Sequence, residues 1–337
     1  MKGFDAKWRD VPHYINGITH EIWEQRQIGS LRTLYAPGLI VRSPASVVVD
    51  NSNVIAATMA TLAEFPDREL LGEDVIWCDD PAGATATSDA FLSSHRLICN
   101  MTHSQAGAYG AATGAKLRYR IIADCAIRDG AVYDEWLVRD QSAIVRQMGF
   151  DAKDWTRDQI TREGGATNCV KPMAPTNDVP GPYTRQGNTD EWGQCYADTL
   201  TRIMAAEMDV IPRAYDRAAN LHYPSGQDAL GWQGADQFWM GLRAAFPTAT
   251  FTIDHVIGRD DPLMPPRAAL RWSMHGTHSG WGRFGTPKGA EVYIMGMCHA
   301  EYGPYGQTGK AAIRREFALI DETAIWKQIL LATGDHP

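Results

Sequence analysis

The strongest constraint on the fold of this chain is an internal repeat. Glu135-Trp136 near the middle of the chain matches Glu316-Phe317 near its end, at an offset of 181 residues (316 − 135). Other segments match in the same order in both halves. At an offset of 181 residues, Phe65-Pro66 matches Phe246-Pro247 and Asp140 matches Asp321. At an offset of 175 residues, Thr102-His103-Ser104 matches Thr277-His278-Ser279 and Gly114 matches Gly289. Several matches in one order are hard to obtain by chance, so the repeat predicts two similar domains in tandem.

Apolar patterns predict the same order of elements in both halves: helices first, then four strands, then a last helix. An apolar stripe at helical spacing extends over 200–215. Asp129-Gly130 between two apolar runs is typical of a tight hairpin, and Asp140 and Asp321 are typical caps of the last helix. Helices are expected at 53–64 and 234–245, and strands at 68–78, 95–103, 115–127, 131–139, 250–258, 267–277, 290–301 and 311–320.

The segment between the repeats is rich in glycine and proline and has little periodicity, which predicts a linker. We therefore expect a first domain at 1–150, a linker at 151–196 and a second domain at 197–337. The mixture of helices and mostly sequential strands in each half predicts the α+β fold class.

Composition excludes several classes of partner. Of 337 residues, 44% are apolar, which is enough for ordinary cores, and the net charge is −8 without a lysine or arginine cluster. We therefore expect no nucleic-acid partner and no membrane partner. No apolar run approaches the ~20 residues of a membrane span, and the start of the chain lacks the apolar core of an export signal. The six cysteines form no CxxC pair, which favours reduced thiols in a cytoplasmic protein.

Four segments carry a family resemblance. Gly276-Thr277-His278-Ser279-Gly280 after Arg271-Trp272, together with Phe65-Pro66-Asp67 and the stretch 129–136, resembles the SnoaL-like polyketide cyclases of the nuclear-transport-factor-2-like superfamily. The resemblance covers about 20–148 and 197–333. It implies two cones, each a curved sheet wrapped by helices around an apolar pocket. The best-known enzymes of that family close polyketide rings by aldol chemistry, without metal or cofactor, and others are dehydratases, isomerases or proteins without an assigned activity.

The acid–base positions of the family carry apolar residues here. Its cyclases place an aspartate just after the segment that matches Glu135-Trp136, and this position is Leu137 in the first domain and Ala318 in the second. The polar partner expected seven residues before Gly130 is Ala123. Since a fold alone supplies no chemistry, the activity has to be inferred from other residues.

The candidate catalytic residues are equivalent pairs in the two domains. His103 and His278 end equivalent strands, and Asp124 and His299 are equivalent by the offset of 175 (299 − 124). A buried carboxylate or imidazole at such places can transfer protons near neutral pH, although loop-fixing hydrogen bonds or outward-facing charges explain the same residues. Our hypothesis is that His299, with Glu301 or His278, moves the proton in the second domain.

The candidate ligand-binding residues also favour the second domain. Arg271 or His275 would stabilise developing negative charge. Aromatic residues with polar edges, which suit a flat or cationic molecule but are also common in cores, gather in the same half: Tyr223, Trp239, Trp272 and Trp281. A metal site is not expected, because His275 and His278 at i and i+3 of a strand point to opposite faces.

We therefore expect a cofactor-independent enzyme, with a cyclase, lyase or isomerase outcome, acting on a small organic molecule. The alternative is a small-molecule-binding or scaffold protein of the same fold that does not react with its ligand. Under either function, we expect the chain to form a homodimer or an intrachain pseudo-dimer, and in the pseudo-dimer the two cones would pack sheet to sheet.

Overall fold

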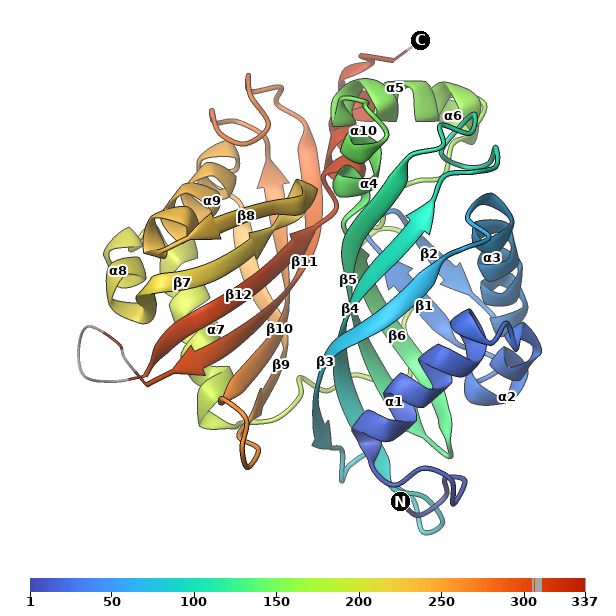
Figure 1. Cartoon of the computed structure of the whole chain (residues 1–337). Helices are drawn as coiled ribbons and strands as arrows, with labels where there is room; N and C mark the ends of the chain where they lie inside the picture. The colour runs from blue at the N-terminus through green and yellow to red at the C-terminus, as the bar shows by residue number, and fades with distance from the viewer. Residues whose placement is uncertain (305, 307–310, 337) are drawn as a thin grey trace.

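The computed structural model describes residues 1–304, 306 and 311–336, and it contains two six-stranded sheets (Figure 1). Their strand orders are β2-β1-β6-β5-β4-β3 and β8-β7-β12-β11-β10-β9. In both sheets the second pair of neighbours in this order is parallel, β1 with β6 and β7 with β12, and the other neighbours are antiparallel. The identical order confirms the predicted α+β fold class with two tandem copies.

The first domain and the following segment contain α1 (Val11–Thr19), α2 (Leu31–Leu34), β1 (Ile40–Ser43), β2 (Ser46–Val49), α3 (Asn51–Glu64), β3 (Glu69–Asp79), β4 (Ala90–Thr102), β5 (Lys116–Arg128), β6 (Ala131–Arg139), α4 (Gln141–Gln147), α5 (Ala152–Arg162) and α6 (Gly165–Asn168). The second domain contains α7 (Glu191–Met204), α8 (Ile211–Ala214), β7 (Tyr215–Tyr223), β8 (Gln227–Leu230), α9 (Trp232–Ala245), β9 (Thr250–Arg259), β10 (Arg267–Thr277), β11 (Glu291–Gly303), β12 (Ala312–Ile320) and α10 (Glu322–Thr333).

The predicted strands are confirmed to within two residues at each end, except that β4 begins five residues earlier than expected. The predicted helical stripe is interrupted after Met204 and resumes as short helical turns at Met208–Val210 and Ile211–Ala214. Ala206 adopts a positive φ of 68°, which ends α7, and Tyr215 already begins β7. The hairpins β1–β2 and β7–β8 were not predicted, because three of their four strands have only four residues and leave little periodicity to detect.

The predicted turn and caps are confirmed. Asp129 and Gly130 adopt φ of 54° and 70°, the left-handed pair that a two-residue hairpin needs between β5 and β6. The Asp140 carboxylate accepts the amide of Ala143, and the Asp321 carboxylate accepts the amide of Ala324, so both cap the following helix.

The segment expected to be a linker is largely built into the fold. It contains α5 and α6, and α7 starts inside it at Glu191. Tyr183 is 5% exposed, and its hydroxyl lies 2.8 Å from Nε2 of His255 in the second domain. The domain boundaries at 150 and 197 stay a prediction, but 151–196 is more than a flexible connection.

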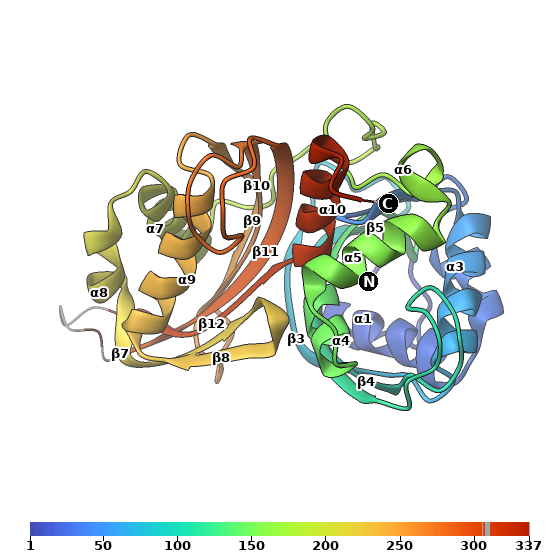
Figure 2. The ribbon, with the colours of Figure 1, turned by 90° about the horizontal axis from the view of Figure 1, so that it is seen from above.

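The two sheets pack face to face, with the helices on their outer sides (Figures 1 and 2). Polar pairs cross the interface in a pseudo-symmetric way. Arg96 Nη1 lies 3.1 Å from His299 Nδ1, and the equivalent Arg271 Nε lies 3.4 Å from Asp124 Oδ2. The apolar centre of this interface is formed by residues of both sheets: Ile76, Leu92, Ile122, Trp136, Ile257, Ala269, Met295, Met297 and Leu319. The chain therefore forms the expected pseudo-dimer within itself.

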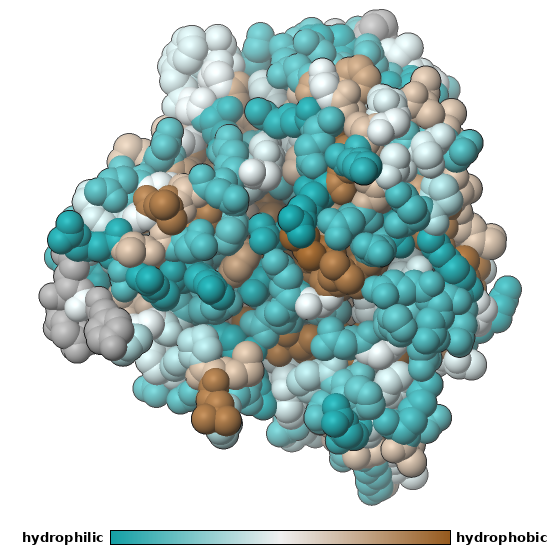
Figure 3. Space-filling model, in the orientation of Figure 1, coloured by the Kyte–Doolittle hydropathy of each residue, from teal (hydrophilic) through white to brown (hydrophobic). Residues whose placement is uncertain are grey.

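The concave side of each sheet is closed by helices, α1 and α3 in the first domain and α7 and α9 in the second (Figure 2). On the face shown in Figure 3, apolar surface is limited to small patches, one of which lies near the boundary between the domains, and the rest is mostly polar. Among the described residues, no helix combines the length and apolar character needed to cross a membrane.

Candidate functional site

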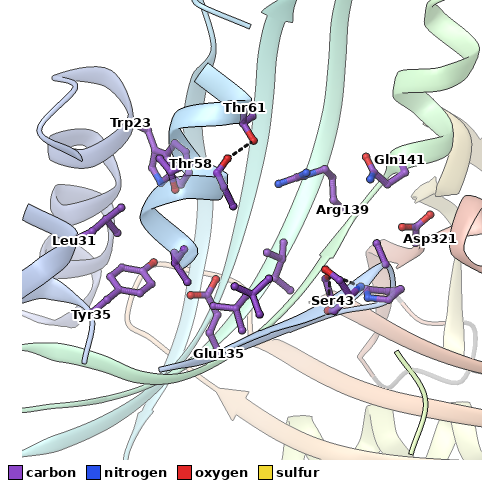
Figure 4. Close-up of a pocket in the computed structure, with 18 residues that line it drawn as sticks. Trp23, Leu31, Tyr35, Ser43, Thr58, Thr61, Glu135, Arg139, Gln141 and Asp321 are labelled. Carbon is purple, nitrogen blue, oxygen red and sulfur yellow. Dashed lines mark hydrogen bonds between the residues drawn. The ribbon is translucent and has the colours of Figure 1, made fainter. Parts of the chain in front are cut away.

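The interior of the first domain contains a cavity of about 300 Å³ (Figure 4). It lies between β1, β2, β6 and the helix α3, with Asp321 of the second domain at one edge. A second cavity of about 90 Å³ adjoins it. Both are lined by Trp23, Tyr35, Glu135, Leu137 and Arg139, so we treat them together as the first-domain cavity.

Glu135 is the acidic group that both parts of this cavity share. It lies on β6, opposite Val41 of β1, and is 7% exposed. Burial raises the pKa of its carboxyl group to about 7, and a hydrogen bond from Tyr35 offsets part of this effect. Burial also holds the pKa of the Tyr35 hydroxyl well above its ordinary value, so Tyr35 is a neutral donor. A carboxyl group that titrates near neutral pH in a cavity can both take and return a proton.

Three basic residues line the same cavity. Arg139 follows Glu135 on β6, Arg68 precedes β3, and the Arg68 guanidinium lies 4.8 Å from the centroid of the Trp23 ring. His95 of β4 is 4% exposed. Burial lowers the pKa of His95 to about 3, with a contribution from the positive charge of Arg96, so the ring is neutral at pH 7. A neutral imidazole and the positively charged guanidinium groups can all donate hydrogen bonds to a ligand oxygen.

The apolar residues at the family's acid–base positions lie where the resemblance places them. Leu137 lines both parts of the first-domain cavity, and Ala123 lines the smaller part. Glu135 lies two residues before Leu137 and therefore shares its strand face. The carboxylate of this cavity is thus displaced by two residues along β6 from the position that the family uses.

In the second domain the equivalent interior is filled by side chains. Glu316, the counterpart of Glu135, is fully buried and accepts hydrogen bonds from Tyr196, Tyr215 and Tyr223 at 2.7, 2.6 and 2.6 Å. Trp239 is fully buried beside these residues. The first-domain cavity therefore has no equivalent in the packed interior of the second domain, whereas the sequence had predicted the better pocket for the second domain.

Two of the aromatic residues explain this difference. Val41 pairs with Glu135 and Leu221 with Glu316, so Ser43 of the first domain is equivalent to Tyr223 of the second. Thr58 of α3 is likewise equivalent to Trp239 of α9, by the offset of 181 (239 − 58). Ser43 and Thr58 line the cavity, while Tyr223 and Trp239 occupy the same space in the second domain.

The candidate histidines at the strand ends are both buried, and the ring of His103 forms hydrogen bonds that fix its loop, while neither ring nitrogen of His278 has a hydrogen-bond partner among the described residues. His103 Nε2 lies 3.2 Å from Glu64, and its Nδ1 lies 3.1 Å from Thr113. His278 is fully buried against Phe246, and burial lowers its pKa. The structure places neither residue on the first-domain cavity, and their catalytic roles stay predictions.

The structure brings His299, Glu301, Asp124 and Arg271 together, but between the two sheets and not in a cone. His299 Nε2 lies 2.8 Å from Ser94, and Arg96 also contacts Glu301, at 3.2 Å. These contacts join the two domains and favour an interface role. Among the described residues, no group of three or more His, Cys, Asp or Glu side chains is arranged to hold a metal ion.

The remaining candidates are separated from one another. Trp272 is fully buried in the core of the second domain. His275 is exposed and lies 3.5 Å from Glu291, and Trp281 is 69% exposed. None of them contributes to the first-domain cavity.

Sequence reasoning missed Glu135, Tyr35, Arg68, His95 and Arg139 as site residues. A signal for Glu135 was present, because it recurs as Glu316 and shares the strand face of Leu137. Arg68 and Arg139 had no signal of this kind, since a single arginine beside a strand is usually a solvated charge.

The first domain is a sheet covered by helices around a cavity, and the second domain has the same strand order with a filled interior. Residues 194–302 match the family of SnoaL-like domains. The second domain is therefore a SnoaL-like domain, and the first domain repeats its strand order.

Several solved structures are similar to part of the chain. IdmH from Streptomyces antibioticus, a candidate polyketide cyclase, has 21% identity over 41% of this chain and 98% of its own, with a TM-score of 0.35. A candidate SnoaL-like polyketide cyclase from Jannaschia sp. CCS1 has 15% identity over 44% and 99%, with a TM-score of 0.34. TsrD from Streptomyces laurentii has 16% identity over 43% and 98%, with a TM-score of 0.35. Comparison with curated protein sequences gives no match.

Proposed function

We propose that the first domain is a cofactor-independent enzyme that transfers a proton on a small organic molecule, with Glu135 as the acid–base group. One observation carries this proposal: the Glu135 carboxyl lines a cavity of about 300 Å³, and burial raises its pKa to about 7. A group of this kind exists in both protonation states at neutral pH, as proton shuttling requires.

The chemistry follows from the neighbours of Glu135. The ionised carboxylate takes a proton from a carbon next to a carbonyl group. The electron pair of the broken C–H bond forms a C=C bond, and the π pair of the C=O bond moves to the carbonyl oxygen. Hydrogen-bond donors on the cavity wall, such as Tyr35 and His95, stabilise the resulting enolate. Return of the proton to another atom gives an isomer, loss of a neighbouring group gives a lyase product, and attack on a second carbonyl closes a ring.

Deuterium exchange tests this proposal without knowledge of the substrate. Neutral ketones with an enolisable carbon, such as 2-tetralone, are incubated with the protein in D₂O, and exchange is followed by NMR. We expect the native protein to accelerate exchange and Glu135→Gln to lose about 10²-fold or more of this acceleration. Glu69→Gln, at an exposed position of β3, is the matched control and should retain it.

A second function is a binding domain that does not react with its ligand. The apolar residues Leu137 and Ala123 at the family's acid–base positions favour it. Ketone binding by calorimetry without any acceleration of exchange by the native protein would support this second function and contradict the first.

A further inference from the structure

We infer that the first-domain cavity binds a small organic carboxylate, whose anionic group is held by Arg68 and Arg139. This inference rests on the proposed function, because it names the substrate class of the same cavity.

Unsatisfied donors carry the inference. Arg68 is 3% exposed and lines the cavity, and its Nε and Nη1 are buried without a hydrogen-bond partner among the described residues. Nε of Arg139 is also buried without a hydrogen-bond partner among these residues. Neither guanidinium forms an ion pair within 4.0 Å with a carboxylate of the described residues. A buried charge without a partner is costly, so native structures normally supply one.

The immediate neighbours of the two arginines are neutral. Trp23 stacks on Arg68, and Tyr109 forms a hydrogen bond with Arg139. Tyr119 lies near both, and burial raises its pKa although the two arginines partly oppose this effect, so its hydroxyl stays protonated. Within the part of the chain that the structure describes, the two guanidinium groups therefore have no carboxylate within 4.0 Å. A planar carboxylate of a ligand would match the paired N–H groups of a guanidinium.

The second domain shows that the fold does not need these charges. By the offset of 181, Arg68 is equivalent to Ala249 and Arg139 to Ile320, and both are buried in the apolar core of the second domain. At these two pairs of equivalent positions, the arginines occur in the domain with the cavity and apolar residues occur in the other domain. This coincidence assigns them to a ligand and not to the stability of a cone.

Two matched probes test the inference: 2-naphthoate and its neutral isostere 2-naphthamide, titrated by calorimetry at pH 7.5. We expect the native protein to bind naphthoate about tenfold or more tightly than naphthamide, because charge-assisted hydrogen bonds exceed neutral ones. Arg68→Ala and Arg139→Ile, which introduce the residues of the second domain, should each reduce the naphthoate affinity about tenfold and leave naphthamide unchanged. Arg68→Lys keeps the charge and should retain part of the preference.

Arg32→Ala, at an exposed position of α2, is the control and should bind like the native protein. Equal affinity of the native protein for both probes, no binding of naphthoate, or an unchanged preference in both arginine variants would overturn the inference. A lower Tm of Arg68→Ala together with unchanged naphthoate affinity would assign the arginine to folding instead. Exchange of a neutral ketone is measured separately, so failure of the carboxylate preference leaves the role of Glu135 standing.

Discussion

The two domains share one backbone plan but differ in what fills their interiors. Glu135 and Glu316 occupy the same position of equivalent strands, yet Glu135 faces a cavity and Glu316 is held by three tyrosine hydroxyls in a packed core. Ser43 and Thr58 leave room where Tyr223 and Trp239 do not. A few side chains therefore decide whether a cone of this kind is a pocket or a scaffold.

The comparison predicts its largest effect for a substitution that opens the second domain. Trp239→Thr places the residue of the first domain in a fully buried site and creates a cavity there. We expect the free energy of unfolding, measured by urea denaturation, to fall by about 3–5 kcal/mol. A loss below about 1 kcal/mol would mean that the second domain tolerates an open interior, and that tight packing is not what separates it from the first domain.

The second effect is the pH dependence of stability that arises from the raised pKa of Glu135. Its pKa is raised from 4.5 to about 7, so the folded chain holds this proton more tightly than the unfolded chain. The resulting stability is present at low pH and is lost as the pH rises from 4.5 through 7. The difference of about 2.5 pH units (7 − 4.5) corresponds to about 3 kcal/mol.

Glu135→Gln should therefore be more stable than the native protein at pH 8, by up to about 3 kcal/mol relative to the same comparison at pH 4.5. Urea denaturation at the two pH values measures it, and Glu69→Gln serves as the exposed control. Identical pH profiles of the native protein and Glu135→Gln would show that this carboxyl is not buried in a cavity of low polarity.

A smaller effect is expected between the domains. His299→Gln weakens contacts to Ser94 and Arg96 and should reduce the free energy of unfolding by about 1–2 kcal/mol. Ketone exchange should continue, because His299 lies between the sheets and outside the first-domain cavity. Loss of exchange with full stability would instead restore the catalytic role predicted from the sequence.

The smallest change in stability is expected for the reverse swap, Thr58→Trp. The cavity of about 300 Å³ has room for an indole ring, so the free energy of unfolding should change by less than about 1 kcal/mol. Naphthoate binding, measured by calorimetry, should nevertheless disappear. Retained binding would place the ligand site elsewhere in the molecule.

Sequence alone predicts the architecture well, because repeats and strand periodicity are local signals. The matched Glu-aromatic anchors, the turn at Asp129-Gly130 and the caps Asp140 and Asp321 all lie where the pattern requires them. Strand ends follow from apolar runs that do not depend on the partner strand.

The site could not be predicted in the same way, because it depends on which face of each strand looks inward. Asp124 and His299 are buried ionisable groups on long strands, but they face the opposite sheet. Glu135 shares the inward face of Leu137, but a bulge before Asp134 breaks the alternation with the start of β6, where Ala126 pairs with Asp134 and Ile127 pairs with Val132. Aromatic enrichment was also misleading, since Tyr223 and Trp239 fill space and do not line it.

The face-to-face packing of the sheets within one chain has an evolutionary consequence. In a dimer of identical subunits every substitution appears twice, so a change that benefits one pocket is forced on the other. Here Ser43 can differ from Tyr223, and Arg68 from Ala249, because a single gene encodes both members of the pair. Dilution also cannot separate partners that share a backbone. Covalent fusion thus frees one half to specialise while the other half supports it.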